Sequence, residues 1–439
     1  MKRRGIPGRH ILSGLLIGAL LLSSFPAAIA EVYTTENSQT AAQADDKDWS
    51  GYTPISSTAE LDKLRGNLAG KYYLTQDIIF TEADFAEDGA FYNAGSGWEP
   101  VGTPEDPFTG ILDGNGFCIE GLRIHLSGQE TLYAGLFGVN AGRVENLGMR
   151  GGEVTAEVFS SDESAEQIEA YAGSIAGHSP GIIKDCSNSG KITASAESRH
   201  TPVSAYAGGI AGRVDNYEEI YTKVSLDVCY NTGDIFASAF TGSPLDSKSS
   251  NAYAGGIVGH SGYWLRIENC HNLGGVTVTM SEPTTGRGAA GGIAGVAGEF
   301  GGIQNCYNTG GINITSSTAS LFAGGIAGIG DNEIKYCYNT GDIKADAQNA
   351  TVYAGGVAGS NFGYDGFCIS ECYNTGKIRA KSSTIAYAGG ITGINGEHGG
   401  IINCYNIGDA AGTADNVQAG AVIGNNMGKA DNCYFLLIL

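Results

Sequence analysis

Charged residues are scarce in this 439-residue chain, which has 46 acidic and 25 basic side chains and a net charge of −21. The shortage of positive charge excludes binding to nucleic acid, or to anionic lipid, through the overall electrostatic field. A wholly disordered chain is also excluded, because such chains are rich in charge and poor in apolar residues, whereas this one is 16% charged and 42% hydrophobic. We therefore expect a folded protein.

Long apolar runs are almost absent. The single long run, residues 11–25, follows a basic segment and precedes the small-residue sequence Ala28-Ile29-Ala30. This order is typical of a secretory signal peptide, which we assign to residues 1–30, with a membrane anchor as the alternative. No further run of about 18 apolar residues follows. We predict an extracellular chain, secreted or at the cell surface, without a membrane span after signal removal.

Catalytic and metal-binding patterns are missing as well. The chain has no H-E-x-x-H motif, its seven histidines are scattered, and the close pair Cys368 and Cys372 has no histidine nearby to complete a zinc site. Polysaccharide-cleaving β-helices need converging carboxylates. Here the residues that follow the glycine of each repeat are of mixed charge: Lys191, Asp234, Gly275, Gly311, Asp342, Lys377 and Asp409. We expect no enzyme activity, no metal and no cofactor.

Glycine is in excess: 69 of the 439 residues are glycine, which is more than twice the average share of about 7%. Many of these glycines belong to a repeat that begins with an aromatic residue followed by Ala-Gly. Copies such as YAGGIAG start at Tyr133, Tyr171, Tyr206, Tyr253, Ala289, Phe322, Tyr353 and Tyr387, with a degenerate copy at Gln418. The copies are 31 to 47 residues apart, which is the spacing of a repeat architecture.

The second half of each unit carries a cysteine, and CYNTG occurs verbatim four times. The segments between repeats alternate β-branched and small residues, which indicates strands, and no unit has the periodicity of a helix. One unit cannot bury its own apolar side, but stacked units can. We therefore predict an all-β, right-handed parallel β-solenoid of eight to nine coils, with two or three short strands per unit.

The cysteines are predicted to form one internal column in this solenoid, because a small apolar side chain suits a tight interior. The column comprises Cys186, Cys229, Cys270, Cys306, Cys337, Cys372, Cys404 and Cys433. Reduced, buried thiols are the favoured state and disulfides between coils the alternative. Ile lies three residues before most of these cysteines, so the chain must bend or bulge between the two if both are buried.

The asparagine two residues after each cysteine is predicted to accept left-handed backbone and to bond to its equivalent in the next coil. The glycine two residues later is expected to supply a positive φ at the corner. The tyrosine between cysteine and asparagine should point outward. A row of Tyr230, Tyr307, Tyr338, Tyr373 and Tyr405 is thus a candidate ligand-facing surface for a sugar chain or a protein partner. Cross-strand stacking that stiffens the coils is the alternative.

The segment before the repeats differs in character. Residues 31–50 are polar and aperiodic, which indicates a disordered linker. Ser57 and Glu60 form a possible capping box for a short helix over 57–68, which would cover the open end of the solenoid. Residues 51–132 would thus contain this cap and the first coils, ahead of a repeat solenoid over 133–435 and an apolar tail over 436–439. Because nothing polar follows that tail, the C-terminal coil is expected to self-associate.

These repeats resemble a known family. YAGLFGVNAGRVENLGM from Tyr133, the later AGGIAG and NCYNTG copies, and the lead-in WEPVG, PFTGILDGNG are similar to the GLUG-motif repeats of bacterial secreted and surface proteins. The resemblance covers roughly 50–435 and implies an extracellular β-solenoid. Some members carry the repeats beside an IgA-degrading zinc peptidase domain, which the missing H-E-x-x-H motif argues against here. We expect a non-catalytic binding, adhesion or display module that recognises an extracellular glycan or a host or cell-surface protein. The alternatives are a polysaccharide-active enzyme and a structural spacer.

Overall fold

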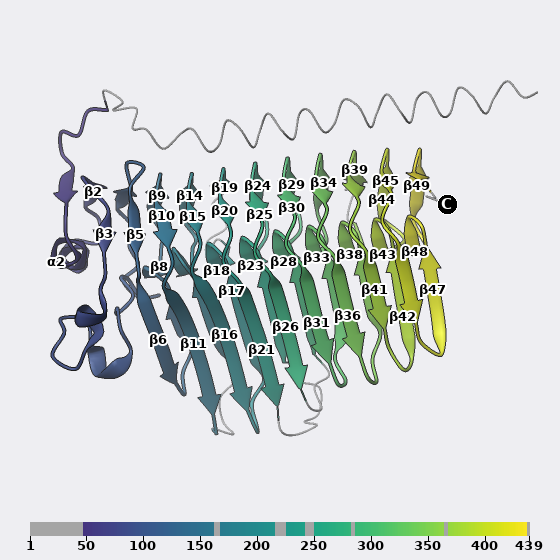
Figure 1. Ribbon diagram of the computed structural model, residues 1–439, viewed down its shortest axis with the longest axis horizontal. Coiled ribbons are helices and arrows are strands. Elements are labelled where there is room, and N and C mark those ends of the chain that lie inside the picture. The colour runs from purple at the N-terminus through teal and green to yellow at the C-terminus, as the bar shows by residue number, and fades with distance from the viewer. Residues whose placement is uncertain are drawn as a thin grey trace, which may run out of the picture. The chain divides into compact units, whose positions relative to one another are not determined.

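The computed structural model describes residues 47–161, 167–215, 225–241, 250–281, 286–363 and 368–436. The predicted signal peptide, most of the linker, and residues 437–439 of the tail lie outside these ranges. The chain divides into two units after Ser50, and the fold described below belongs to the unit that begins at Gly51. It consists of five parallel sheets, which we call S1 to S5 in the order in which one coil passes through them (Figure 1).

Sheets S1 and S2 contain the shortest strands. S1 consists of β1 (Thr53–Ile55), β2 (Lys71–Leu74), β4 (Ile111–Asp113), β9 (Arg143–Glu145), β14 (Ile182–Lys184), β19 (Ser225–Asp227), β24 (Arg266–Glu268), β29 (Gly302–Gln304), β34 (Glu333–Lys335), β39 (Cys368–Ser370), β44 (Gly400–Ile402) and β49 (Lys429–Asp431). S2 consists of β3 (Ile78–Ile79), β5 (Cys118–Glu120), β10 (Gly148–Arg150), β15 (Ser187–Asn188), β20 (Tyr230–Asn231), β25 (His271–Asn272), β30 (Tyr307–Asn308), β35 (Tyr338–Asn339), β40 (Tyr373–Asn374), β45 (Tyr405–Asn406) and β50 (Tyr434–Phe435).

The remaining sheets have nine strands each. S3 consists of β6 (Arg123–Gly128), β11 (Glu153–Ser160), β16 (Lys191–Ser198), β21 (Ile235–Thr241), β26 (Val276–Ser281), β31 (Ile312–Ser316), β36 (Ile343–Ala347), β41 (Ile378–Lys381) and β46 (Ala410–Thr413). S4 consists of β7 (Leu132–Ala134), β12 (Ile168–Gly173), β17 (Val203–Gly208), β22 (Asn251–Gly255), β27 (Arg287–Gly291), β32 (Ser320–Gly324), β37 (Val352–Gly355), β42 (Ile385–Gly389) and β47 (Asn416–Gly420). S5 consists of β8 (Phe137–Val139), β13 (Ala176–His178), β18 (Ala211–Val214), β23 (Val258–Ser261), β28 (Ala294–Ala297), β33 (Ala327–Gly330), β38 (Ala358–Asn361), β43 (Thr392–Asn395) and β48 (Ile423–Asn426).

The predicted parallel β-solenoid is confirmed. Nine complete coils, from β4 to β48, each contribute one strand to all five sheets within the described ranges. The expectation of two or three strands per unit is wrong, because each coil has five. Apart from β5 and β10, the S2 strands are only two residues long, as in Tyr338–Asn339, and two residues are too few to show an alternating pattern.

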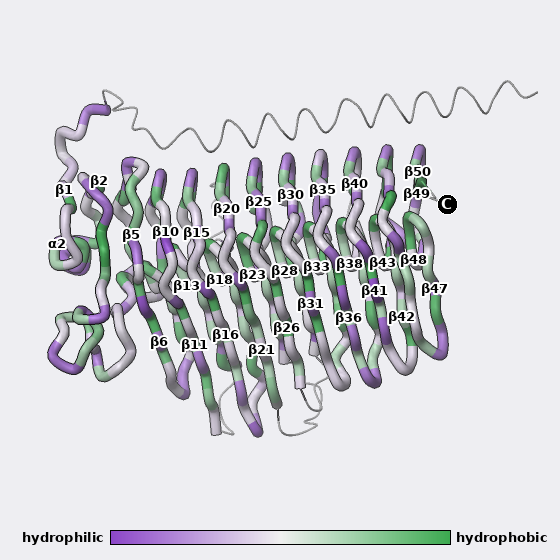
Figure 2. The backbone as a smooth tube through the Cα atoms, in the orientation of Figure 1, coloured by the Kyte–Doolittle hydropathy of each residue, from purple (hydrophilic) through white to green (hydrophobic). Residues whose placement is uncertain are grey.

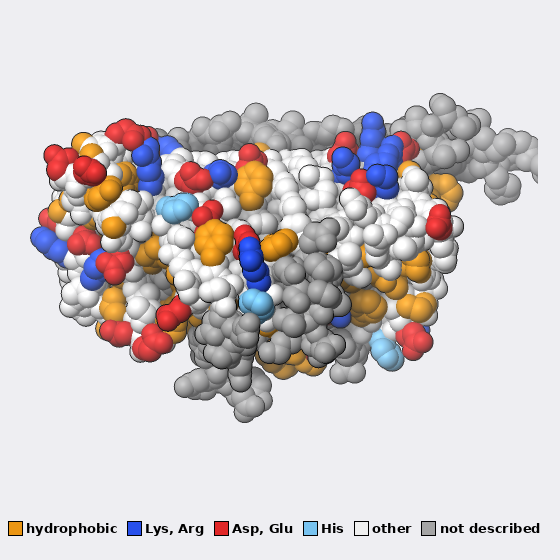
Figure 3. Space-filling model, turned by 90° about the horizontal axis from the view of Figure 1, so that it is seen from below, with side chains coloured by type: hydrophobic (Ala, Val, Ile, Leu, Met, Phe, Trp, Pro, Cys, Tyr) orange, Lys and Arg blue, Asp and Glu red, His pale blue; other side chains and the backbone are white. Residues whose placement is uncertain are grey.

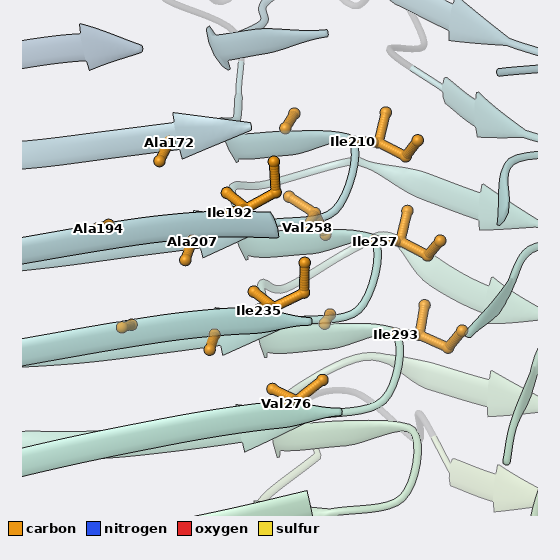
Figure 4. Packing of buried hydrophobic residues seen from close by; sticks show 14 of the residues in the cluster. Ala172, Ile192, Ala194, Ala207, Ile210, Ile235, Ile257, Val258, Val276 and Ile293 are labelled. Carbon is orange, nitrogen blue, oxygen red and sulfur yellow. The ribbon is translucent and has the colours of Figure 1, made fainter. Parts of the chain in front are cut away.

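Register between coils places like residues on like. Tyr206 pairs with Tyr253, and Ile303 pairs with Ile334. In the interior, Ile192, Ile235 and Val276 of S3 form one column, and Ile210, Ile257 and Ile293 form another at the turn between S4 and S5 (Figure 4). Hydrophobic and hydrophilic residues alternate along the strands, so that each coil buries one face (Figure 2).

The bend that the Ile-to-Cys spacing requires lies at the residue directly before each cysteine. Asn269, Asn305 and Asn403 have φ of 56, 53 and 54°, which is left-handed backbone, and both Ile303 and Cys306 are buried. Asn tolerates this conformation better than most residues, which explains its frequency here. The prediction of left-handed backbone at the asparagine after the cysteine is wrong, since that residue lies in an S2 strand.

The corner glycine is needed for closeness and not for a positive φ. At Gly233 an added Cβ would lie 2.0 Å from the carbonyl oxygen of Gly190 in the preceding coil. Gly233 is not among the glycines with a positive φ, so the predicted left-handed glycine is wrong. Any side chain at this position would push the two coils apart.

The N-terminal cap is a single turn of helix, α2 (Thr58–Asp62), followed by a 3-10 turn, η1 (Lys63–Gly66). The Ser57 hydroxyl accepts the amide of Glu60 at 3.2 Å, as the capping box predicts. The Glu60 carboxylate, however, accepts from the backbone amide and the hydroxyl of Ser56, at 2.8 and 2.7 Å. Leu61 and Leu64 are buried, which anchors the cap on the first coils.

The opposite end of the solenoid is open in the described residues. Strands β46 to β50 are the last in their sheets, and their side chains are largely exposed, including Tyr434 at 66% and Phe435 at 59%. Self-association through this coil stays a prediction. Sedimentation of the purified chain, before and after replacement of residues 436–439 by Lys and Ser, tests it, and a monomer in both cases would contradict it.

Candidate functional site

The predicted row of tyrosines on S2 is a continuous ladder of stacked rings. Tyr230, His271, Tyr307, Tyr338, Tyr373 and Tyr405 follow one another with centroid separations of 5.1, 4.7, 4.9, 4.9 and 5.0 Å. Their planes lie within 7° of parallel. The rings point outward from strands β20 to β45, which places all five predicted tyrosines together. We call this set of six residues the S2 ladder.

The faces of the S2 ladder are not available to a ligand. Each interior ring, such as Tyr338, has another ring within 4.9 Å on both sides. A sugar or an aromatic group that stacks on a ring needs an open face, and only edges and hydroxyl groups point outward here. Of the six rings, only that of Tyr230 is exposed, with 42% of its surface accessible; the other five are half-buried. The geometry therefore favours the stiffening role over the ligand platform.

His271 belongs to the S2 ladder and was missed by the search for tyrosines. It pairs in register with Tyr230 and Tyr307, and the sequence CHNLG, which aligns with CYNTG, is the signal that would have found it. Burial between the two rings lowers the pKa of His271 to about 4, because the charged imidazolium is poorly solvated there.

The cysteines form the predicted internal column. Cys186, Cys229, Cys270, Cys306, Cys337, Cys372 and Cys404 are at most 1% exposed, and Cys433, in the last coil, is partly buried. In each coil the thiol donates to the carbonyl two residues earlier, for example Cys306 Sγ to Gln304 O at 3.1 Å. The thiols of Cys270, Cys306 and Cys372 also accept an amide from the preceding coil, as in Cys270 N to Cys306 Sγ at 3.4 Å.

All ten cysteines are free thiols, which agrees with the favoured reduced state and not with disulfides between coils. Burial raises the pKa of the Cys186, Cys229 and Cys270 thiols well above the usual range. A neutral thiol is both a poor nucleophile and a poor metal ligand. These three thiols are therefore packing elements and not reactive sites.

The asparagines after the cysteines form a second internal column, hydrogen-bonded along its whole length. The Nδ2 of each donates to the Oδ1 of the next at 2.8 Å, through Asn188, Asn231, Asn272, Asn308, Asn339, Asn374 and Asn406. The same Nδ2 also donates to the carbonyl two residues later, such as Gly341 O at 2.8 Å from Asn339. The predicted bond from coil to coil is confirmed.

A second row of rings lies on the outward face of S4. Tyr133, Tyr171 and Tyr206 stack at 5.0 and 4.8 Å, and Phe322, Tyr353 and Tyr387 stack at 4.8 and 5.2 Å. Between them Ala289 replaces a ring, and Tyr253 is tilted 59° from Tyr206. These aromatics open the repeat, so the same register argument that predicts the S2 ladder also predicts this row.

A network of charged and polar groups lies beside the first part of the S4 row. Arg213 Nε is 2.6 Å from Asp215 Oδ2, and His178 Nε2 is 2.5 Å from Asp215 Oδ1. Although burial raises it, the hydrogen bond from His178 and the charge of Arg213 lower the pKa of Asp215 to about 2. The hydroxyls of Tyr171 and Tyr206 both donate to Glu169. Sequence reasoning missed this network because its members come from two adjacent coils and lie far apart in the sequence.

Two acidic residues of the mixed column after the repeat glycine, Asp234 and Asp342, have a structural role. Asp234 Oδ1 accepts the amide of Gly275 at 3.0 Å, and Asp342 Oδ1 accepts the amide of Lys377 at 2.9 Å. Each of these carboxylates thus adds one hydrogen bond to the backbone of the next coil. Basic and acidic side chains are mixed on the face shown in Figure 3, without separation by sign. In the described ranges no three His, Cys, Asp or Glu side chains form a metal-binding group. Within the same ranges, no helix has both the length and the apolar character that a membrane crossing requires.

Comparison with known proteins finds partial relatives. No protein-family model matches the chain. A 137-residue segment, 30% of the chain, is 34% identical to a provisionally named Gly-rich membrane protein of Evansella cellulosilytica and covers 14% of it. A 147-residue segment, 32% of the chain, is 33% identical to halomucin of Haloquadratum walsbyi and covers 1% of it. The chain therefore spans a small part of the curated relatives it matches.

One solved structure is similar in outline. A provisionally assigned immunoglobulin A1 protease from Bacteroides ovatus aligns with a TM-score of 0.46 and 21% identity, over 68% of this chain and 78% of that one. None of these relatives carries a GLUG name, so membership of that family remains a prediction.

Proposed function

We propose that this chain is an exported GLUG-type repeat module that acts at the cell surface as a stiff, non-catalytic display or adhesion element. The observation that carries the proposal is the uninterrupted register of nine complete coils, each tied to the next in five sheets. In a solenoid built in this way each coil stacks on the one before it, so the number of coils sets the length of the module.

Three features support stiffness over catalysis. The asparagine ladder is hydrogen-bonded through seven coils, and the S2 ladder stacks six rings. The acidic residues at the S2–S3 corner bond to backbone amides and do not converge on a cleft. The names of the partial relatives, a Gly-rich membrane protein and halomucin, support a surface location.

The proposal separates into display and adhesion, and one experiment distinguishes them. Residues 51–439 are purified and applied to arrays of extracellular glycans and of host surface proteins. A reproducible partner supports adhesion, whereas a blank array together with an elongated particle in small-angle scattering supports display. Hydrolysis or depolymerisation of any arrayed polysaccharide would refute a non-catalytic module.

The surface location is tested separately. An antibody against the folded coils should label intact cells that express the full chain, and deletion of residues 1–30 should abolish the label. Labelling that appears only after cell lysis would contradict export.

A further inference from the structure

A pocket of about 200 Å³ lies on the N-terminal coils, away from both rows of rings. One side is formed by the segment that leaves S2 after β3 and contains two 3-10 turns, η2 (Glu82–Phe85) and η3 (Asn93–Gly95). The other side is the outward face of β6 and β11 in S3. At roughly 30 Å³ per water molecule the pocket has the volume of six or seven waters, which suits one small ring and not a drug-sized ligand.

The two sides of the pocket differ in chemistry. Phe85 and Tyr92 contribute aromatic rings from the 3-10 segment. Arg123, Glu153 and Thr155 contribute a guanidinium, a carboxylate and a hydroxyl from S3. A purely apolar ligand would displace water from the polar groups of S3 and offer no hydrogen bond in exchange, which costs binding free energy.

The charges of the pocket are already balanced by the protein. Arg123 Nη1 lies 2.7 Å from Glu82 Oε2, and Lys191 Nζ lies 2.8 Å from Glu153 Oε1. An anionic ligand would meet the Glu153 carboxylate without an unpaired cation to offset it. A cationic ligand would meet Arg123 in the same way. The pocket therefore suits an uncharged ligand that has both hydroxyl groups and an apolar face.

The aromatic wall is fixed before any ligand arrives. Asn93 and Ala94 have φ of 42 and 51°, a conformation that an alanine rarely adopts. The segment is tied to β6 by the amide of His125, which donates to Ser96 O at 2.8 Å, and by the amide of Trp98, which donates to Arg123 O at 2.8 Å. Backbone strain held in this way is often found at binding sites, and a preformed wall lowers the entropic cost of binding.

We propose that this pocket binds a single neutral monosaccharide unit, free or at the end of a glycan. The apolar C–H face of the sugar packs on Tyr92, because Phe80 and the Arg123 guanidinium already lie against the ring of Phe85. The hydroxyls of the sugar bond to Thr155, Arg123 and Glu153. This inference rests on the geometry of the first coils. It holds whether or not the protein acts at the cell surface and whether or not the solenoid displays another domain. A ligand of this size makes few contacts, so we expect a dissociation constant in the millimolar range.

The test uses saturation-transfer NMR on residues 51–439 with glucose, galactose, mannose and N-acetylglucosamine, and with glucuronic acid as the charged analogue. At least one neutral sugar should show transfer and titrate in the millimolar range, and glucuronic acid should bind more weakly than its neutral counterpart. No transfer from any neutral sugar, or preferred binding of glucuronic acid, would overturn the proposal.

Variants locate the site. Tyr92→Ala and the nearly isosteric Thr155→Val should each weaken binding about tenfold, since each removes one contact with the sugar. Tyr263→Ala is the matched control, because that ring is 63% exposed and lies outside the pocket. Unchanged circular dichroism and melting temperature show that the variants fold. Binding that is lost in Tyr263→Ala and kept in Tyr92→Ala would place the sugar elsewhere and refute the assignment.

Discussion

The inward and outward faces of S2 differ although they come from the same two-residue strands. Inward, seven successive coils place asparagine at the same position, from Asn188 to Asn406. Outward, the paired positions hold Ser187, then tyrosines, with His271 among them. Within these seven coils no other residue replaces the amide, whereas a stacked ring only needs another flat group beside it. The S4 row tolerates even the loss of a ring, since it continues beyond Ala289.

The largest effect should come from placing a charge inside. Cys337→Asp is expected to destabilise the protein by about 4 kcal/mol, because a carboxylate without a partner would replace a buried thiol. Urea unfolding followed by circular dichroism measures the loss. Cys337→Ala is the control and should cost about 1 kcal/mol, since it removes only one buried sulfur. Similar losses for the two variants would mean that the site can hydrate, against the assignment of a closed column.

Breaking the asparagine ladder should come next. Asn339→Leu leaves Gly341 O and Asn374 Oδ1 without their donor and Asn308 Nδ2 without one acceptor, at a cost of about 3 kcal/mol. The midpoint of urea unfolding is the measurement. Thr340→Ala, one residue further and exposed, should change it little. A loss no greater than that of the threonine variant would show that the ladder adds nothing to stability.

The histidine in the S2 ladder predicts a pH dependence. The pKa of His271 is lowered to about 4 in the fold, against about 6.5 in an unfolded chain. Stability is therefore complete above pH 6.5 and falls as the pH drops toward 4, by on the order of 2 kcal/mol for this residue. His271→Tyr, which makes the ladder uniform, should reduce the difference in unfolding free energy between pH 7.5 and pH 4.5. An unchanged difference would mean that the imidazole is not enclosed by its neighbours.

The smallest effect is expected outside. Tyr338→Ser removes two ring contacts and should cost about 1 to 2 kcal/mol, less than Cys337→Asp at the neighbouring residue. Tyr230→Ser removes the single contact with His271 and should cost about half as much. Thermal melting of the two variants and of the parent measures the ratio. If Tyr338→Ser proved as costly as the change at Cys337, the outward assignment would fail.

Repetition explains how much of this structure the sequence predicts. Like residues recur at fixed spacing, so the parallel register, the Cys column and the Asn ladder follow from the pattern alone. The number of strands per coil did not follow, because two-residue strands have no periodicity. The left-handed residue was placed at the wrong asparagine, since both Asn305 and Asn308 fit the composition of a corner.

The non-repeating parts of the candidate sites were harder to predict. Glu169, Arg213 and Asp215 come from coils whose equivalents carry other residues, so only the folded chain brings them together. The N-terminal pocket depends on the 3-10 segment around Asn93. No local sequence pattern predicts the left-handed backbone of this segment. The closed faces of the S2 ladder are likewise a matter of ring geometry, which spacing does not reveal.

The stacking of coils also determines how the molecule would respond to force. The backbone hydrogen bonds between coils run along the line from α2 to β49, the two ends of the solenoid in Figure 1. A pull applied between those ends loads each coil-to-coil contact in series, so the weakest contact yields first and the coils beyond it stay folded. Each released coil would lengthen the tether while the remaining stack keeps its register.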